Sequence, residues 1–124
     1  MSRADAVVLV TGATGKVGQQ FIARFLADEA WAGARVRALC HNRLLDESER
    51  LQVVRGSISE RAVVEGAMDG VTHVVHLATC KETPDDVMDV TVKGLFWLLE
   101  ACRTSSTFAQ FVLIGGDAGM GHFV

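Results

Sequence analysis

A chain of 124 residues with 49% hydrophobic residues and a single proline has room for one modest hydrophobic core. This composition excludes a disordered chain, and we expect one domain spanning residues 1–124. The formal net charge of −3 provides no basic field for a polyanion, so nucleic acid is not an expected partner.

The cysteines and the N-terminus bear on the cellular compartment of the protein. Cys40, Cys80 and Cys102 are widely spaced, form no CxxC pair and have no histidine at zinc-ligand spacing, which predicts a reduced protein without a metal site. The N-terminal apolar run is too short for a signal sequence, and no apolar segment is long enough to span a membrane. We therefore expect a cytoplasmic protein with no membrane partner.

The first half of the chain alternates short apolar runs with one amphipathic segment. Ala6–Val10 is a β-branched run too short for a helix and predicts a buried strand. From Lys16 the apolar residues recur every three or four positions, which predicts a helix whose apolar face fades near residues 27–30. Arg35–Leu39 and Leu51–Val54 predict the second and third strands.

The second half continues this alternation. Ser57–Glu60 fits a capping box, which predicts a short helix directly behind it. Val71–Ala78 predicts a fourth strand. Thr83–Asp86 combines a threonine cap, a proline at the first helical position and two acids, which predicts the start of a long helix. Phe108–Ile114 is the expected fifth strand.

Strands that alternate with helices favour an α/β protein in which a parallel sheet has helices on both faces. No helix is predicted after the fifth strand. Its apolar surface is therefore expected to be partly exposed.

The motif TGATGKVG, residues 11–18, joins the first predicted strand to the first predicted helix. Glycine suits a sharp turn, a close approach of the backbone to a pyrophosphate and tight packing of helix on strand. The helix N-terminus would offer free N–H groups to phosphates. The motif therefore predicts a nucleotide site, with a plain structural turn as the alternative.

Other polar and aromatic residues have simpler interpretations. His73 and His76 are three apart on a strand, so they lie on opposite faces and cannot share a metal ion. Phe96 and Trp97 are interpreted as packing residues. Asp117, in the closing glycine-rich stretch, is either a turn former or a base.

The glycine motif resembles the TGxxGxxG signature of the short-chain dehydrogenase/reductase superfamily, in its extended branch of NAD(P)-dependent sugar epimerases and dehydratases. Further segments follow in the family's order: residues 53–60 resemble its third-strand "GDL.D" segment, residues 71–79 its "vDaViHLAa" strand, and residues 89–102 its "NV.GT.NLLEAa" helix. The resemblance spans essentially the whole chain. It implies a Rossmann-type doubly wound parallel sheet of about five strands in the order 3-2-1-4-5.

The resemblance also implies a set of NAD(P)-binding residues. A glycine turn and the first amides of the helix would hold the pyrophosphate, the residues after the third strand would edge the adenine, and those after the fourth would pass beneath the nicotinamide-side ribose. The implied residues are Gly12, Thr14, Gly15, Lys16, Val17, Gly18, Cys40, His41, Arg43, Ser57, Ile58, Leu77, Ala78 and Thr79.

The residues after the second strand bear on the choice of dinucleotide. Cys40 falls where an NAD-preferring member has an aspartate that accepts from the ribose hydroxyls, and His41 and Arg43 follow it. A missing carboxylate with basic neighbours favours NADP over NAD. The alternative is that Arg43 is simply solvated at a strand end.

The chain departs from the family pattern at several positions. Ser57 stands in place of the adenine-side aspartate, and Thr91 in place of the asparagine of the long helix. Residues 111–121 resemble the family's "fVyiSSaavYG", with Gly115 and Gly116 at the serines and Met120 at the tyrosine. The family's Tyr-x-x-x-Lys would fall beyond Val124.

The chain contains no tyrosine at all. The family uses that phenol to move a proton as hydride moves, so we expect no catalytic residue in this chain and no turnover by the chain alone. The leading hypothesis is the cofactor-binding part of an extended short-chain dehydrogenase or epimerase, truncated before its catalytic and substrate region. A stand-alone NAD(P)-binding or redox-sensing module and an inactive folded remnant are the alternatives. Because the family's long helix takes part in a dimer contact, we expect a homo-oligomer, a dimer.

Overall fold

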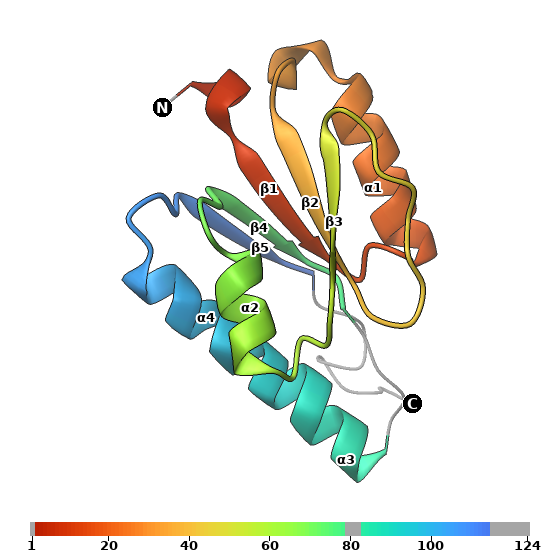
Figure 1. Cartoon of the computed structure of the whole chain (residues 1–124), viewed down its shortest axis with the longest axis vertical. Coiled ribbons are helices and arrows are strands. Elements are labelled where there is room, and N and C mark those ends of the chain that lie inside the picture. Colours follow the sequence, from red (N-terminus) through yellow and green to blue (C-terminus); the bar gives the residue numbers. More distant parts are fainter. Residues whose placement is uncertain (1, 79–82, 115–124) are drawn as a thin grey trace, which may run out of the picture.

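The computed structural model describes residues 2–78 and 83–114, which form a five-stranded parallel sheet with flanking helices (Figure 1). The strands lie in the order β3-β2-β1-β4-β5, and every neighbouring pair is parallel. This confirms the predicted Rossmann-type arrangement, whose strand order reverses direction between β1 and β4. The strands are β1 (Val7–Thr11), β2 (Arg35–Cys40), β3 (Leu51–Arg55), β4 (His73–His76) and β5 (Gln110–Leu113).

Helices cover both faces of the sheet, as predicted: α1 lies on one face, and α2 and α4 lie on the other (Figure 1). The helical segments are η1 (Arg3–Asp5), α1 (Lys16–Ala27), η2 (Glu29–Trp31), α2 (Arg61–Ala67), α3 (Pro84–Asp86), η3 (Val87–Gly94) and α4 (Leu95–Thr104). Within the described ranges, none of them combines the length and apolar character that a membrane span needs.

Strand β1 is the centre of the molecule, and all five of its residues are buried. Side chains alternate between the two faces, so Leu9 packs with the α2 and α4 side while Val10 packs with the α1 side. A strand buried on both faces needs a continuous apolar run, which explains the composition of this segment.

The long helix starts as predicted. The Thr83 hydroxyl accepts from the Asp86 amide at 3.3 Å, with Pro84 at the first helical position. The helix then runs without interruption from Pro84 to Thr104, but its middle, Val87–Gly94, is a π-helix that the sequence pattern did not predict.

The predicted capping box is wrong. Helix α2 begins at Arg61, four residues after Ser57, and no side chain caps it. The Ser57 hydroxyl instead accepts from the Ser59 amide at 3.2 Å, and the Glu60 amide donates to the Ser57 carbonyl at 3.1 Å. These local bonds make Ser57–Glu60 a turn, because serine competes for backbone donors in turns as well as at helix ends.

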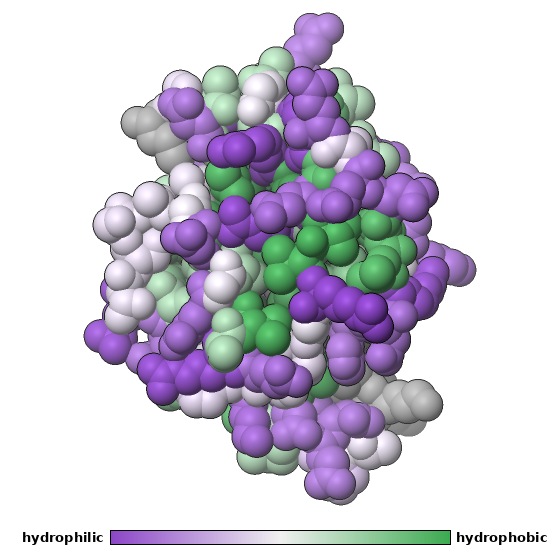
Figure 2. Space-filling model, viewed as in Figure 1, coloured by the Kyte–Doolittle hydropathy of each residue, from purple (hydrophilic) through white to green (hydrophobic). Residues whose placement is uncertain are grey.

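The last two strands are shorter than predicted, because the hydrogen-bonded ladder between them covers only residues 73–76 of β4 and 110–113 of β5. The predicted exposure of the last strand is confirmed: Val112, Leu113 and Ile114 are 36%, 56% and 57% exposed. Figure 2 shows that the opposite part of the sheet, around β3, also presents a hydrophobic area that hydrophilic residues surround.

Candidate functional site

A cavity of about 480 Å³ lies where the chain leaves the carboxyl ends of β1, β2, β3 and β4. In an open parallel sheet this edge, at the reversal of strand order, is where ligands bind. Twelve of the predicted site residues line the cavity: Gly12, Thr14, Gly15, Lys16, Val17, Gly18, His41, Arg43, Ser57, Ile58, Leu77 and Ala78. Thr11, Leu39, Gly56 and Val90 complete the lining.

The glycine turn after β1 is compact because two of its residues lack a side chain. Gly12 has a φ of +67°, and a Cβ placed there would lie 2.6 Å from the carbonyl carbon of Leu77. A Cβ on Gly18 would overlap the carbonyl oxygen of Gly12 and lie 2.9 Å from the Cα of Ala13. The absence of side chains at Gly12 and Gly18 therefore lets the turn and the start of α1 pack closely against the ends of β1 and β4.

The N-terminus of α1 opens into this cavity. Gly15 is the capping residue, and no side chain caps the helix. The amides of Lys16, Val17 and Gly18 occupy the first turn, where no intrahelical acceptor exists. The side-chain amide of Gln19 donates to the Thr14 carbonyl at 2.7 Å and steadies the turn. These free donors and the positive end of the helix dipole suit an anion.

The ionisable side chains that line the cavity are all basic among the described residues. Lys16, His41 and Arg43 line it, and no aspartate or glutamate does so among the described residues. The predicted role of Cys40 needs correction, since its side chain does not line the cavity but packs in the core on the α1 side. The alternation of β2 points Leu39 and Cys40 to opposite faces. Burial raises the pKa of the Cys40 thiol, which favours its neutral form.

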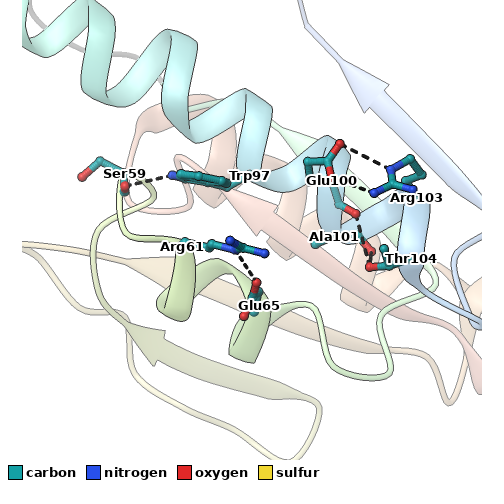
Figure 3. A network of polar contacts seen from close by, with 8 residues as sticks. All are labelled: Ser59, Arg61, Glu65, Trp97, Glu100, Ala101, Arg103 and Thr104. Carbon is teal, nitrogen blue, oxygen red and sulfur yellow. Dashed lines mark hydrogen bonds and ion pairs between the residues drawn. The ribbon is translucent and has the colours of Figure 1, made fainter.

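One wall of the cavity is apolar and lies on the face of the sheet that α2 and α4 cover. Ile58 and Val90 lie in this wall, and Ile58 packs closely against Gly94, where a Cβ would lie 2.9 Å from Ile58 Cγ2. The indole N–H of Trp97 donates to the Ser59 carbonyl at 3.2 Å, so α4 anchors the turn that carries Ile58 (Figure 3). The sequence pattern did not reveal the role of Val90, because nothing in its helix marks a π segment.

The end of β4 forms the floor of the cavity. The Thr11 hydroxyl accepts from the amides of Leu77 and Ala78, both at 3.1 Å, and contacts His76 Nδ1 at 2.6 Å. The predicted site residue Thr79 lies outside the described residues, as do Gly115, Gly116, Asp117 and Met120.

Metal binding is not indicated by the part of the chain that the structure describes, where no group of three potential ligands occurs. His73 contacts Trp31 on the α1 side, whereas His76 contacts Phe111, which packs on the other side. The two imidazoles therefore lie on opposite faces, as predicted.

A larger cavity, about 720 Å³, lies between α2 and α4. Four of its five charged side chains already pair with one another: Arg61 with Glu65 at 2.7 Å, and Arg103 with Glu100 at 2.9 Å (Figure 3). Twelve of the predicted site residues line the smaller cavity, whereas none of them lines this one, so the smaller cavity is the better candidate for a functional site.

The sequence and the fold both have known relatives. The sequence pattern of the NAD dependent epimerase/dehydratase family matches residues 8–123. Dihydroflavonol 4-reductase of Zea mays is 31% identical over 121 residues, which cover 85% of this chain and 33% of that protein. The chain thus spans about a third of the length of this relative.

Two solved structures illustrate the similarity in fold. Uronate dehydrogenase from Agrobacterium tumefaciens aligns with a TM-score of 0.84 at 21% identity, over 97% of this chain and 44% of that chain. The Bordetella bronchiseptica enzyme WbmG, solved in complex with NAD, aligns with a TM-score of 0.67 at 25% identity, over 85% and 36% of the two chains. Because the family pattern covers nearly the whole sequence, the chain belongs to the NAD dependent epimerase/dehydratase family.

Proposed function

We propose that this chain binds NAD(P) in the cavity at the carboxyl ends of β1 to β4, as the cofactor-binding part of an oxidoreductase. The observation that carries this proposal is the uncapped N-terminus of α1, which opens into a cavity with basic side chains and no carboxylate among its described lining residues. A pyrophosphate would rest on the amides of Lys16, Val17 and Gly18. The NAD complex of the relative WbmG supports the same assignment.

The remaining lining residues fit the two ends of such a cofactor. Ser57 and Ile58 would edge the adenine, and Ile58 supplies the apolar surface that a base requires. Leu77 and Ala78 would pass beneath the nicotinamide-side ribose. The bound nicotinamide would supply hydride chemistry, while the protein supplies binding and orientation.

The cavity favours NADP over NAD. His41 and Arg43 line the cavity just after β2, where no carboxylate would repel a 2′-phosphate. Removing one charge-assisted hydrogen bond from a phosphate costs about 1.5–3 kcal/mol, which corresponds to about 10- to 100-fold in affinity. We therefore expect Arg43→Met to weaken NADPH binding by about that factor and to change NADH binding much less, as measured by calorimetric titration.

Arg35→Met is the matched control, because Arg35 starts β2 at the opposite edge of the sheet. It removes the same charge away from the cavity and is expected to leave both affinities within about twofold. Equal losses of NADH and NADPH affinity in Arg43→Met would contradict the NADP preference. A native chain that binds neither dinucleotide would overturn the proposed function itself.

Binding without catalysis is the second candidate, and one observation favours it. The chain has no tyrosine to act as the family's proton donor or acceptor. A purified chain that binds NAD(P)H but never oxidises it, with carbonyl compounds present, is the result expected of a binding or redox-sensing module. Recovery of turnover when a tyrosine-bearing segment is supplied in trans would favour the cofactor-binding part of an enzyme.

Self-association through the long helix is also part of the proposal. Met88, Val92, Phe96 and Leu99 recur every three or four residues, and each is about half exposed. Such a stripe exceeds the scattered apolar residues of a typical monomer surface. We expect the chain to be a dimer by light scattering at micromolar concentration and Phe96→Glu to be a monomer. Leu44→Glu, a change at an exposed loop leucine, is the control and should remain dimeric.

A further inference from the structure

The buried hydroxyl of Thr11 is the centre of a small hydrogen-bond network below the cavity. It lies 2.6 Å from His76 Nδ1 and 3.1 Å from each of the amide nitrogens of Leu77 and Ala78. Thr11 is 1% exposed and His76 is 6% exposed. Water is therefore a poor substitute for any partner in this network.

The donors in the network favour one protonation state of His76 over the others. Backbone amides can only donate, so the two lone pairs of the Thr11 hydroxyl accept from Leu77 and Ala78. The single hydroxyl hydrogen is then left to donate to an unprotonated His76 Nδ1. This pattern of donors favours a neutral imidazole with its proton on Nε2. A protonated ring would bring an N–H against an oxygen that has no lone pair left.

The network matters for the cavity because of what it holds. The Leu77 amide also donates to the Thr11 carbonyl at 3.2 Å, so the chain leaving β4 is tied to the end of β1 at two atoms. Directly above, a Cβ at Gly12 would lie 2.6 Å from the Leu77 carbonyl oxygen and 2.8 Å from the Ala78 nitrogen. The glycine turn and the cavity floor therefore fit together only while these amides stay in place.

The surroundings of His76 contain little that would stabilise a charged ring. From β1 it meets the Thr11 hydroxyl, and from β5 the ring of Phe111 at a centroid distance of 6.1 Å. His73, on its own strand, lies on the opposite face. Burial lowers the pKa of His76, and none of the charged groups in the described ranges contributes to this shift.

We propose that Thr11 and His76 are positioning residues of the dinucleotide site, and that protonation of His76 releases the Leu77–Ala78 floor. This inference rests on the proposed NAD(P) binding. A neutral His76 holds the Thr11 hydroxyl as an acceptor for the two amides. A protonated His76 turns that hydroxyl away, which loosens the floor against Gly12 and weakens dinucleotide binding in acid.

The first experiment titrates the chain with NADH at about pH 8 and at about pH 5, because burial lowers the pKa of His76 and the acid condition must lie well below the ordinary histidine pKa. NADH is chosen because it lacks a 2′-phosphate that titrates in this range, and all proteins carry His41→Gln so that the cavity histidine is silent. We expect affinity to fall about tenfold or more between the two conditions. His76→Asn, whose Oδ1 can accept from the Thr11 hydroxyl without titrating, should bring the ratio of the NADH affinities at the two pH values close to one.

A matched pair of threonine variants separates positioning from general stability. Thr11→Val removes the hydroxyl at the cavity, and Thr72→Val removes a hydroxyl that contacts His73 Nδ1 at 2.7 Å at the opposite end of β4. We expect Thr11→Val to lose about tenfold or more in NADH affinity together with the pH dependence, and Thr11→Ser to restore both. Thr72→Val should keep both. If the ratio of the NADH affinities at the two pH values stays unchanged in His76→Asn or in Thr11→Val, the inference is overturned.

Nitrogen NMR measures the protonation of the His76 ring and the state of its partner amides without any dinucleotide. The inference requires an unprotonated Nδ1 and a protonated Nε2 on His76 at neutral pH, and amide signals of Leu77 and Ala78 that shift together with the titration of its ring. A proton on Nδ1, or amide signals that ignore the ring, would overturn it. Failure of the proposed function has a different signature: no NADH binding at any pH, with these NMR signals behaving as expected.

Discussion

Replacing Gly12 with alanine is expected to lower the free energy of unfolding by about 2–5 kcal/mol and to abolish measurable dinucleotide binding. Two physical costs combine at this position. A left-handed backbone costs a residue with a Cβ about 1–2 kcal/mol, and Gly12 has a φ of +67°. The new Cβ would also lie 2.6 Å from backbone atoms of Leu77, which cannot rotate away as a side chain would. Denaturant unfolding and NADPH titration measure the two effects.

Two other glycines separate these costs. Gly70 also has a positive φ, +74°, but a Cβ there meets nothing within 4 Å, so Gly70→Ala should show the backbone cost alone, about 1–2 kcal/mol. Gly66 lies in α2 with open space around it, so Gly66→Ala should stabilise the protein by about 0.5–1 kcal/mol. Both should keep their affinity for NADPH. A Gly12→Ala variant no less stable than Gly70→Ala would show that the close approach to Leu77 is not required.

The fold was predictable from the sequence because apolar residues recur with a different period in its strands than in its helices. The continuous apolar run of β1 and the three-to-four spacing of α1 are signals that a burial pattern imposes directly. The cap at Thr83 was predictable for a similar reason, since a threonine before a proline and two acids satisfies local donors. The strand order 3-2-1-4-5 followed from the family resemblance and is confirmed.

The backbone part of the candidate site was also predictable. Glycines at a strand-to-helix turn leave little choice of geometry, and the residues after each parallel strand must meet at one edge of the sheet. The error at Cys40 has a different cause. The predicted second strand ended at Leu39, whereas β2 continues through Cys40, and the alternation of side chains along the strand turns Cys40 into the core.

Features made by tertiary contacts left no local signal. Arg50 donates to the carbonyls of Leu26, Trp31 and Ala34 at 2.7–3.0 Å and closes the end of α1, yet its neighbours in the sequence resemble those of any loop arginine. The π segment and the Thr11–His76 network are likewise products of packing between distant elements. Periodicity and motif spacing describe one element at a time and cannot predict such contacts.

Truncating Leu98 to alanine is expected to lower the free energy of unfolding by about 2–5 kcal/mol. Leu98 is fully buried, and it joins α4 to the core between α2 and the sheet, where Leu9, Val64 and Val74 also pack. Deleting its branched end removes buried apolar surface and leaves a cavity that the surrounding helices and strands fill only in part. The measurement is urea unfolding, in which the midpoint should fall while the slope stays constant.

Two controls make the Leu98 result specific to packing. Leu44→Ala is the same change at a residue that is 53% exposed and should cost no more than about 0.5 kcal/mol. Leu98→Met keeps most of the volume and should cost less than about 1.5 kcal/mol. Because Leu98 does not line the cavity, the folded fraction of Leu98→Ala should still bind NADPH, unlike Gly12→Ala. Equal losses of stability in Leu98→Ala and Leu44→Ala would show that α4 does not complete the core, and the anchoring of the Ser57–Glu60 turn by Trp97 would then need another support.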